Sequence, residues 1–281
     1  AGFGVTGNNL GSDLRSVAML SNGGTFWYNG QYVYTYGVSQ NVNPDLRWEK
    51  KYEYNIGFDY AFWNNRIYGS LDTYYRQTRD LLWDYEVPTP PYQYTTLLAN
   101  AGQMDSYGVE LAISGIPVKT KNWTWVTTPT ISFNRNLITR LSDPEKGFNY
   151  TQTTSGGVGE NGIMNTNVQL LTEKEAVGAF YGYSFAGYKS DGTAMYNTPT
   201  GGYISADNAS ESHKQIIGNA QPLFTFGWNN SIRYKNWDAS VFFRGVVGNK
   251  ILNVTRWAYG PQKSVSTNIF MKDAVGTDVK H

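Results

Sequence analysis

The chain has 281 residues and a formal net charge of +1, and charged residues make up 16% of it, fewer than the ~25% typical of soluble domains. This balance gives no reason to expect nucleic acid as a partner, and the absence of cysteine excludes disulfides and thiolate metal sites. Aromatic residues make up another 16%. Few charges with many Tyr and Trp suit a wall that meets lipid, although a carbohydrate-binding β protein would share the aromatic excess.

The mean hydropathy is −0.46, and no run approaches the ~18 apolar residues of a membrane helix. Mean hydropathy is a poor guide to barrel strands, because these are only ~9–11 residues long and about half of each is polar. Composition therefore leaves a membrane barrel and a soluble β protein open.

Apolar and polar residues alternate with a period of two in several segments, which predicts strands. In chain order these segments are 52–62, 66–76, 109–114, 123–134, a weaker case at 178–188, 223–234 and 237–244. In 223–234 one set of alternate residues, here called the apolar parity, contains Phe224, Phe226 and Trp228. The other set, the polar parity, contains Thr225 and Asn229. The pattern fits a soluble sandwich with the apolar face inside, and it also fits a membrane barrel with that face outside.

The connections between these strands alternate between short and long. Short ones at 63–65, 119–122 and 235–236 predict tight hairpins. Long ones run about 9–47, 84–103, 142–167, 189–217 and from 253 onward. An outer-membrane barrel has this layout, with short periplasmic turns and long extracellular loops, whereas a soluble sandwich usually keeps the loops at both ends modest.

Aromatic residues mark the three tight turns. Trp63, Trp123 and Trp237 each lie at a turn, and Phe62 and Tyr234 precede two of them. In a barrel they would form an aromatic girdle at the periplasmic interface. The alternative is that they cap a soluble core, but three Trp at one topological level favour the girdle.

The polar parity of the strands carries charges of both signs. In a sandwich these side chains would face solvent, and in a barrel they would face the lumen. We predict as lumen-lining residues Asp59, Arg66, Asp72, Arg76, Glu110, Asn229, Arg233 and Arg244.

Aromatic residues in the long loops are the candidates for substrate binding, because exposed rings stack on sugar faces or clamp peptides. The alternatives are that these rings pack loop on loop or meet a partner protein. The candidates are Trp27, Tyr28, Tyr34, Tyr92, Tyr94, Trp257 and Tyr259.

No catalytic constellation stands out. The two histidines, His213 and His281, are far apart and lack metal-ligand spacing. The pair Asp191-Gly192 indicates a turn rather than a calcium loop. We therefore expect a protein that is not an enzyme and needs no metal or cofactor.

Several motifs together resemble one family. Residues 43–50 read NPDLRWEK, close to the NPDLKWEK signature of SusC/RagA-like TonB-linked outer-membrane proteins. Asn100-Ala101-Gly102-Gln103-Met104 followed by Gly108-Val109-Glu110-Leu111 resembles another motif of that family. Residues 178–183, 217–222 and 234–246 also match, in the family's order across nearly the whole chain.

The resemblance implies an all-β, antiparallel, up-and-down transmembrane barrel of ~22 strands, of which this chain supplies about nine. Residues 1–281 would be a part of the barrel from its C-terminal half, without the plug domain or the last strands. The resemblance also implies an outer-membrane, TonB-dependent transporter that imports oligosaccharides or peptides. Its partners would be a SusD-like surface lipoprotein, TonB-ExbB-ExbD acting through the absent plug, and outer-membrane lipid.

The alternative that composition leaves open is a soluble or surface-anchored all-β module that binds carbohydrate, such as a lectin-like adhesin. A glycoside hydrolase is a weaker third possibility, because the sequence supports no acid/base pair. Whether the apolar face of the strands is buried or exposed separates these hypotheses. A soluble module would bury it between sheets, and a barrel would leave it as an exposed belt.

Overall fold

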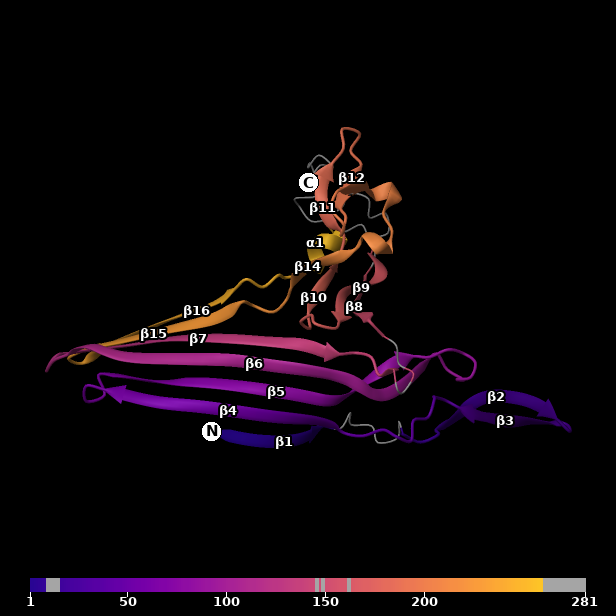
Figure 1. Cartoon of the computed structure of the whole chain (residues 1–281), viewed down its shortest axis with the longest axis horizontal. Coiled ribbons are helices and arrows are strands. Elements are labelled where there is room, and N and C mark those ends of the chain that lie inside the picture. The colour runs from indigo at the N-terminus through magenta and orange to yellow at the C-terminus, as the bar shows by residue number, and fades with distance from the viewer. Residues whose placement is uncertain (9–15, 145–146, 148–149, 161–162, 260–281) are drawn as a thin grey trace.

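A computed structural model describes residues 1–8, 16–144, 147, 150–160 and 163–259. Its largest element is one open antiparallel sheet, here called the wall; of the three smaller sheets, one lies beyond the right-hand end of the wall in Figure 1 and two stand above it. No helix within these residues has the length and apolar character of a membrane span.

The wall has seven strands, and its antiparallel, up-and-down order confirms the fold predicted from the sequence. In spatial order they are β1 (Gly2–Asn8), β4 (Glu49–Phe62), β5 (Ile67–Glu86), β6 (Thr96–Lys119), β7 (Trp123–Arg140), β15 (Phe224–Tyr234) and β16 (Trp237–Val247). The described wall thus has fewer strands than the expected total of about nine. The weak alternation at 178–188 does not add a wall strand.

That segment divides instead into two short strands, β10 (Ala179–Gly182) and β11 (Ser184–Tyr188), which belong to different small sheets. Gly178 and Gly187 have φ of +90° and +122°, a backbone conformation that only glycine adopts easily. These two residues bend the chain at positions where a wall strand would have to continue straight.

The tight turns all lie at one end of the wall, at the left of Figure 1. Trp63, Asn64 and Asn65 have φ between +51° and +61°, and the N–H of Arg66 donates to the carbonyl of Phe62 over 3.1 Å. Asn tolerates this left-handed region better than most residues, so the sequence Asn64-Asn65 suits the turn.

The long connections contain structure of their own. The first holds a hairpin of β2 (Leu20–Tyr28) and β3 (Gln31–Val38). A four-stranded sheet has the order β14 (Gln215–Asn219), β10, β9 (Ile163–Thr172) and β8 (Gln152–Glu160), and a three-stranded sheet joins β11, β12 (Ala194–Asn197) and β13 (Tyr203–Ser205). Short helical turns are η3 (Ala206–Asn208), η4 (Glu211–His213) and α1 (Val254–Tyr259).

The second long loop, expected at about 84–103, is much shorter than the sequence predicted. β5 continues to Glu86 and β6 begins at Thr96, so only residues 87–95 connect them. The reason is a small apolar core at this outer end, which contains Tyr85, Leu97 and Ala101. Burial raises the pKa of Tyr85 to about 12, so its hydroxyl stays protonated and donates to the carbonyl of Leu141 over 3.2 Å.

Strand register gives the wall two chemically distinct faces. Leu71 of β5 lies opposite Phe58 and Leu111, and the same row continues through Ile131 to Phe226. The next row, on the other face, runs Asp72, Glu110, Ser132 and Thr225. The predicted alternation is therefore confirmed across adjacent strands.

The apolar face of the wall is exposed rather than buried between sheets. Phe58 is 64% exposed, Val241 and Phe243 are each 52% exposed, and Phe224 is half-buried. The buried apolar residues of the described chain lie instead in the loop region and at the outer ends of the wall, as at Ala101. The described chain therefore does not use this face as a core.

Residues 39–48, here called the strap, run alongside β6 and are attached mainly by asparagine amides. Asn41 donates to the carbonyls of Tyr94 and Thr96 over 2.6 and 2.8 Å, and Asn43 donates to that of Leu98 over 2.9 Å. These side chains take the place of a backbone ladder. Part of the NPDLRWEK motif thus fastens the chain just before β4.

Asn100 completes the attachment from the β6 side. Its buried amide accepts the N–H of Arg47 over 2.8 Å and donates to the carbonyls of Arg47 and Asp80 over 2.8 and 2.7 Å. One side chain therefore serves three backbone groups, which a shorter or apolar residue could not do.

We expect Asn100→Ala to lower the unfolding temperature of the full-length protein in detergent, because each buried backbone group left without a partner costs roughly 1–3 kcal/mol. Hydrogen exchange at the Arg47 amide should accelerate. Asn8→Ala is the control, since the Asn8 amide bonds Glu49 at an exposed position. Unchanged exchange at Arg47 would contradict this role of Asn100.

Candidate functional site

The polar face of the wall brings together most of the residues predicted to line a lumen. Strand pairing places on this face Asp59, Asp72, Arg76, Glu110, Asn229, Arg233 and Arg244. Arg66 lies instead in the turn before β5. Because the described sheet is open, the lumen itself stays a prediction.

A polar network crosses four strands on this face. Arg76 makes two hydrogen bonds to Glu53, of 2.9 and 3.1 Å, and its guanidinium lies 4.6 Å from the centre of the Tyr74 ring. Tyr74 in turn donates to Oδ1 of Asn134 over 2.6 Å. Asn134 donates to Ser132 over 2.9 Å. The network fixes these side chains against the sheet.

Gly108 of β6 makes that crossing possible, because it lies between Tyr74 and Asn134 in the register. A Cβ at this position would lie 2.5 Å from both Asn134 Oδ1 and Tyr74 Cε1. Only glycine leaves room for the tyrosine to reach across the strand. The Gly of the GVEL motif therefore has a specific packing role.

Two carboxylates form the next row of this face. Asp72 and Glu110 are direct cross-strand partners, an arrangement in which like charges repel. With Ser132 and Thr225 they line a shallow depression of about 250 Å³. No group of three or more His, Asp or Glu that could hold a metal ion occurs in the described residues. The face suits contact with a polar solute.

The first long loop presents its aromatic residues on both sides of the β2–β3 hairpin. Trp27 lies opposite Tyr32, with ring centres 4.8 Å apart, and Tyr34 is on the same side. Tyr28 lies on the other side beside Phe26. Trp27, Tyr28 and Tyr34 are 59%, 65% and 63% exposed. Figure 1 shows the hairpin projecting beyond the outer end of the wall.

The other candidate aromatics are scattered. The hydroxyl of Tyr94 donates to the carbonyl of Val38 and so holds the base of the hairpin. Tyr92 is at the margin of the same connection and is 36% exposed, and Trp257 is 40% exposed in α1. The side chain of Tyr259 lies outside the described part of the chain. Among the candidates whose side chains are described, Trp27 and Tyr34 are the two that share one side of the hairpin.

Carboxylates anchor two of the outer loops. The N–H of Leu141 donates to the Glu173 carboxylate over 2.9 Å, and the hydroxyl of Ser142 donates to the same carboxylate over 3.2 Å. These hydrogen bonds hold the pKa of Glu173 below its usual value. The N–H of Thr193 donates to Asp191 over 2.8 Å and lowers its pKa likewise. Asp191 lies in a turn, as predicted.

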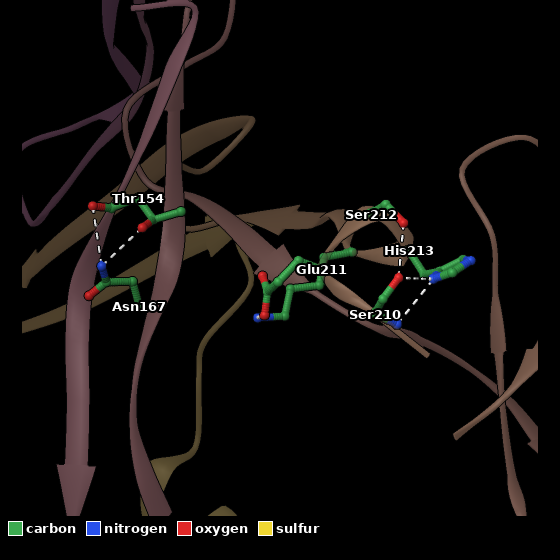
Figure 2. Close-up of polar contacts among 7 residues, drawn as sticks. Thr154, Asn167, Ser210, Glu211, Ser212 and His213 are labelled. Carbon is green, nitrogen blue, oxygen red and sulfur yellow. Dashed lines mark hydrogen bonds and ion pairs between the residues drawn. The ribbon is translucent and has the colours of Figure 1, made fainter. Parts of the chain in front are cut away.

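A serine–histidine contact on η4 resembles a catalytic pair but serves as a helix cap. Ser210 Oγ lies 2.9 Å from Nδ1 of His213, and the Ser210 N–H also donates to that nitrogen over 3.1 Å (Figure 2). Glu211, the nearest acid along the chain, is paired with Lys214 at 2.7 Å. Among the described contacts no acid orients the imidazole, as nucleophilic catalysis requires.

Sequence reasoning missed the Tyr74–Asn134 crossing and the asparagine clamp of the strap. Both join residues far apart in the chain, so no local pattern reveals them. The one usable signal was a glycine within a regular strand pattern, since such a glycine often marks close approach of another group.

Gly108→Ala should destabilise the folded protein by roughly 1–3 kcal/mol, because the added methyl group overpacks the crossing. The unfolding temperature of the full-length protein in detergent measures this. Gly4→Ala is the matched control, since Gly4 lies on the same face of β1 and a Cβ added there would have nothing within 4 Å. Equal effects of the two substitutions would refute the packing role.

Comparison with known proteins gives consistent relatives. No family model matches the chain. TonB-dependent receptor P3 of Formosa agariphila is 31% identical over 99% of the chain and 29% of its own length. TonB-dependent receptor SusC of Bacteroides thetaiotaomicron is 29% identical over 89% of the chain and 25% of its own length.

Solved structures show the same fold. The RagAB peptide transporter matches with a TM-score of 0.74 and 23% identity, over 99% of this chain and 30% of the matched one. Its "open-open" state as a peptide importer matches with a TM-score of 0.71 over 88% of this chain and 25% of that one. The chain spans less than a third of the length of these relatives. It is therefore SusC/RagA-like along nearly its whole length, with the fold of a segment of a TonB-dependent receptor barrel.

Proposed function

We propose that this chain is part of the wall of an outer-membrane, TonB-dependent active transporter of the SusC type. The observation that carries the proposal is the exposed apolar face of the wall, which is bounded at each end by aromatic side chains. Such a belt is the outer surface of a membrane barrel.

The belt has the dimensions of a membrane-spanning strand. At its outer end Phe3, Tyr54, Tyr75 and Tyr107 form one row in register. At the turn end Trp63, Trp123 and Trp237 are 72%, 46% and 79% exposed, and Trp123 packs 4.3 Å from Tyr234. From Tyr54 to Phe62 β4 covers about nine residues, which fits the ~9–11 of a barrel strand.

The rival hypothesis, a soluble or surface all-β carbohydrate-binding module, needs a cover for this face. Phe58 and Phe243 would have to be buried by a second sheet, yet they are 64% and 52% exposed. Leaving so large an apolar surface in water would promote aggregation. The transporter hypothesis is therefore favoured over the soluble one.

For the whole protein, the proposed activity is import of oligosaccharides or peptides, with energy from TonB-ExbB-ExbD acting through a plug domain. One solved structure is described as a peptide transporter, so peptides have a precedent among similar proteins, and import of oligosaccharides is what the resemblance to the SusC type implies. We propose that a SusD-like surface lipoprotein docks on the outer loops. The role of this chain is structural and binding rather than enzymatic.

The β2–β3 hairpin is the proposed substrate-contact element among the outer loops. Residues 16–44 contain no Asp, Glu, Lys or Arg, so the hairpin offers no ion pair to a ligand. One side presents Trp27, Tyr32 and Tyr34 with Thr25 between them. Rings with neighbouring hydroxyls suit stacking and hydrogen bonding to a neutral sugar more than binding of a charged peptide.

Leu71→Arg tests the membrane-facing assignment. A cation on the lipid side near mid-belt costs roughly 2–4 kcal/mol, so the folded yield of the full-length protein in outer membranes should fall sharply. Ser70→Arg, one residue away on the polar face beside the open depression, should be tolerated. If both variants fold equally well, the face assignment is wrong.

Combined Trp27→Ala and Tyr34→Ala substitutions test the hairpin. Loss of stacking worth ~0.5–1.5 kcal/mol per ring should weaken the binding of neutral oligosaccharides by about tenfold. Phe26→Ala with Val33→Ala, on the other side of the hairpin, is the control. Binding can be measured by calorimetry with the full-length protein. Equal loss in both double variants would indicate a general folding role.

A further inference from the structure

A row of basic side chains crosses the apolar face just outside the belt. Lys50 of β4 is the direct cross-strand partner of Arg79 on β5, and Gln103 of β6 is that of Arg140 on β7. The guanidinium of Arg79 donates to the side-chain carbonyl of Gln103, which joins the two pairs into one row. Parity places Lys50, Arg79 and Gln103 on the side of Tyr54 and Tyr75, and Arg140 joins this row as the partner of Gln103 across a register shift in β7.

The positive charges of the basic row are not neutralised by carboxylates within the row. Two cations directly opposite each other destabilise a sheet. The ion pairs among the described residues use Lys51, Arg76 and Lys214, so Lys50, Arg79 and Arg140 have no carboxylate partner there. Their hydrogen bonds go to neutral groups, as when Arg140 donates to the carbonyl of Ala101 over 3.3 Å.

The adjacent row on the same face contains one acidic residue. Asp105 pairs with Gln77 and Leu137 in the row between the tyrosines and the cations. One of its oxygens accepts the hydroxyl of Tyr75 over 2.5 Å. Counting Lys50, Arg79 and Arg140 against Asp105 leaves a local charge of 3 − 1 = +2 in these rows. This excess of positive charge attracts an anion.

We infer that this basic row binds the phosphate groups of a phosphorylated glycolipid in the outer leaflet, an inference that rests on the proposed outer-membrane function. Arginine presents a fork of donors that matches phosphate oxygens, and lysine adds a point charge. Basic clusters at headgroup level bind anionic lipid headgroups. The bound lipid would brace the outer end of the wall where strand pairing alone leaves the cations repelling one another.

The position of the row favours a lipid over a free anion. Lys50 lies four residues beyond Tyr54 on the same face of the same strand, about 13 Å along the tilted strand and about 10 Å along the membrane normal, which places it near the outer edge of the headgroup region. Trp48, two residues farther along, is 62% exposed on this side. The apolar belt directly below would hold the acyl chains of the molecule whose phosphates meet the cations.

The test uses full-length protein in neutral phosphatidylcholine nanodiscs doped with bis-phosphorylated lipid A, and native mass spectrometry counts the lipid A retained. Lys50→Gln should weaken retention about fivefold, and the triple variant with Arg79→Gln and Arg140→Gln at least about tenfold, since each cation at a charged surface contributes about that first factor. Lys51→Gln, the adjacent residue on the opposite face, should retain lipid A like the wild type.

Three other results would each overturn a different part of the proposal. Equal retention of dephosphorylated lipid A would overturn the phosphate assignment. Full displacement of lipid A by millimolar inorganic phosphate would identify a free-anion site and overturn the lipid assignment. If the triple variant folds poorly, Lys50→Gln alone decides, because its exposed side chain has no ion-pair partner in the described chain. Wild-type protein that stays soluble without detergent would instead refute the outer-membrane function itself.

Discussion

The register that the strands share through the middle of the wall is the constraint on which the other features depend. Side chains alternate with a period of two, so a slip of one residue between any two strands would turn an apolar set onto the polar face. Leu71, Leu111 and Phe226 stay in one row because each strand keeps its phase with the next. The lipid-facing belt and the polar network both follow from this phase, whereas the basic row lies beside the register shifts at the outer end.

Near the outer end the register is interrupted, and side chains take over from the ladder. A bulge in β5 between Thr78 and Leu81 lets Asp80 adopt a φ of +55°. The carbonyl of Asp80 accepts a hydrogen bond from the amide of Asn100, which also holds the strap. Backbone groups that leave the ladder must find other partners, and asparagine amides supply both donor and acceptor.

The sequence predicted what depends on neighbouring residues and missed what depends on distant ones. The alternation, the three tight turns and the shared level of Trp63, Trp123 and Trp237 could all be recognised locally. The extension of β5 and β6 could not, because Gly, Pro and Tyr between 84 and 103 resemble a loop until the core around Tyr85 is assembled. The alternation of apolar and polar residues cannot show that a strand continues where its side chains are buried by a segment distant in the sequence.

The candidate site was predictable to a similar extent. Parity alone placed Asp72, Glu110 and Arg233 on one face, and the pairing agrees. Parity could not separate Tyr94 from Trp27, since both are loop aromatics in the sequence. The distinction is that the Tyr94 hydroxyl meets a backbone carbonyl, whereas the ring of Trp27 remains 59% exposed.

The outer hairpin depends on the wall more than its own two strands suggest. A two-stranded hairpin is at best marginally stable alone in water. Its base is fixed by the N–H of Ser39, which donates to Met19 over 2.9 Å, and by Tyr94 at Val38. Both contacts adjoin the strap, and the strap is fastened to β6 by Asn41 and Asn43. The position of the hairpin and its exposed rings therefore depends on hydrogen bonds that run from the outer end of β6 through the strap.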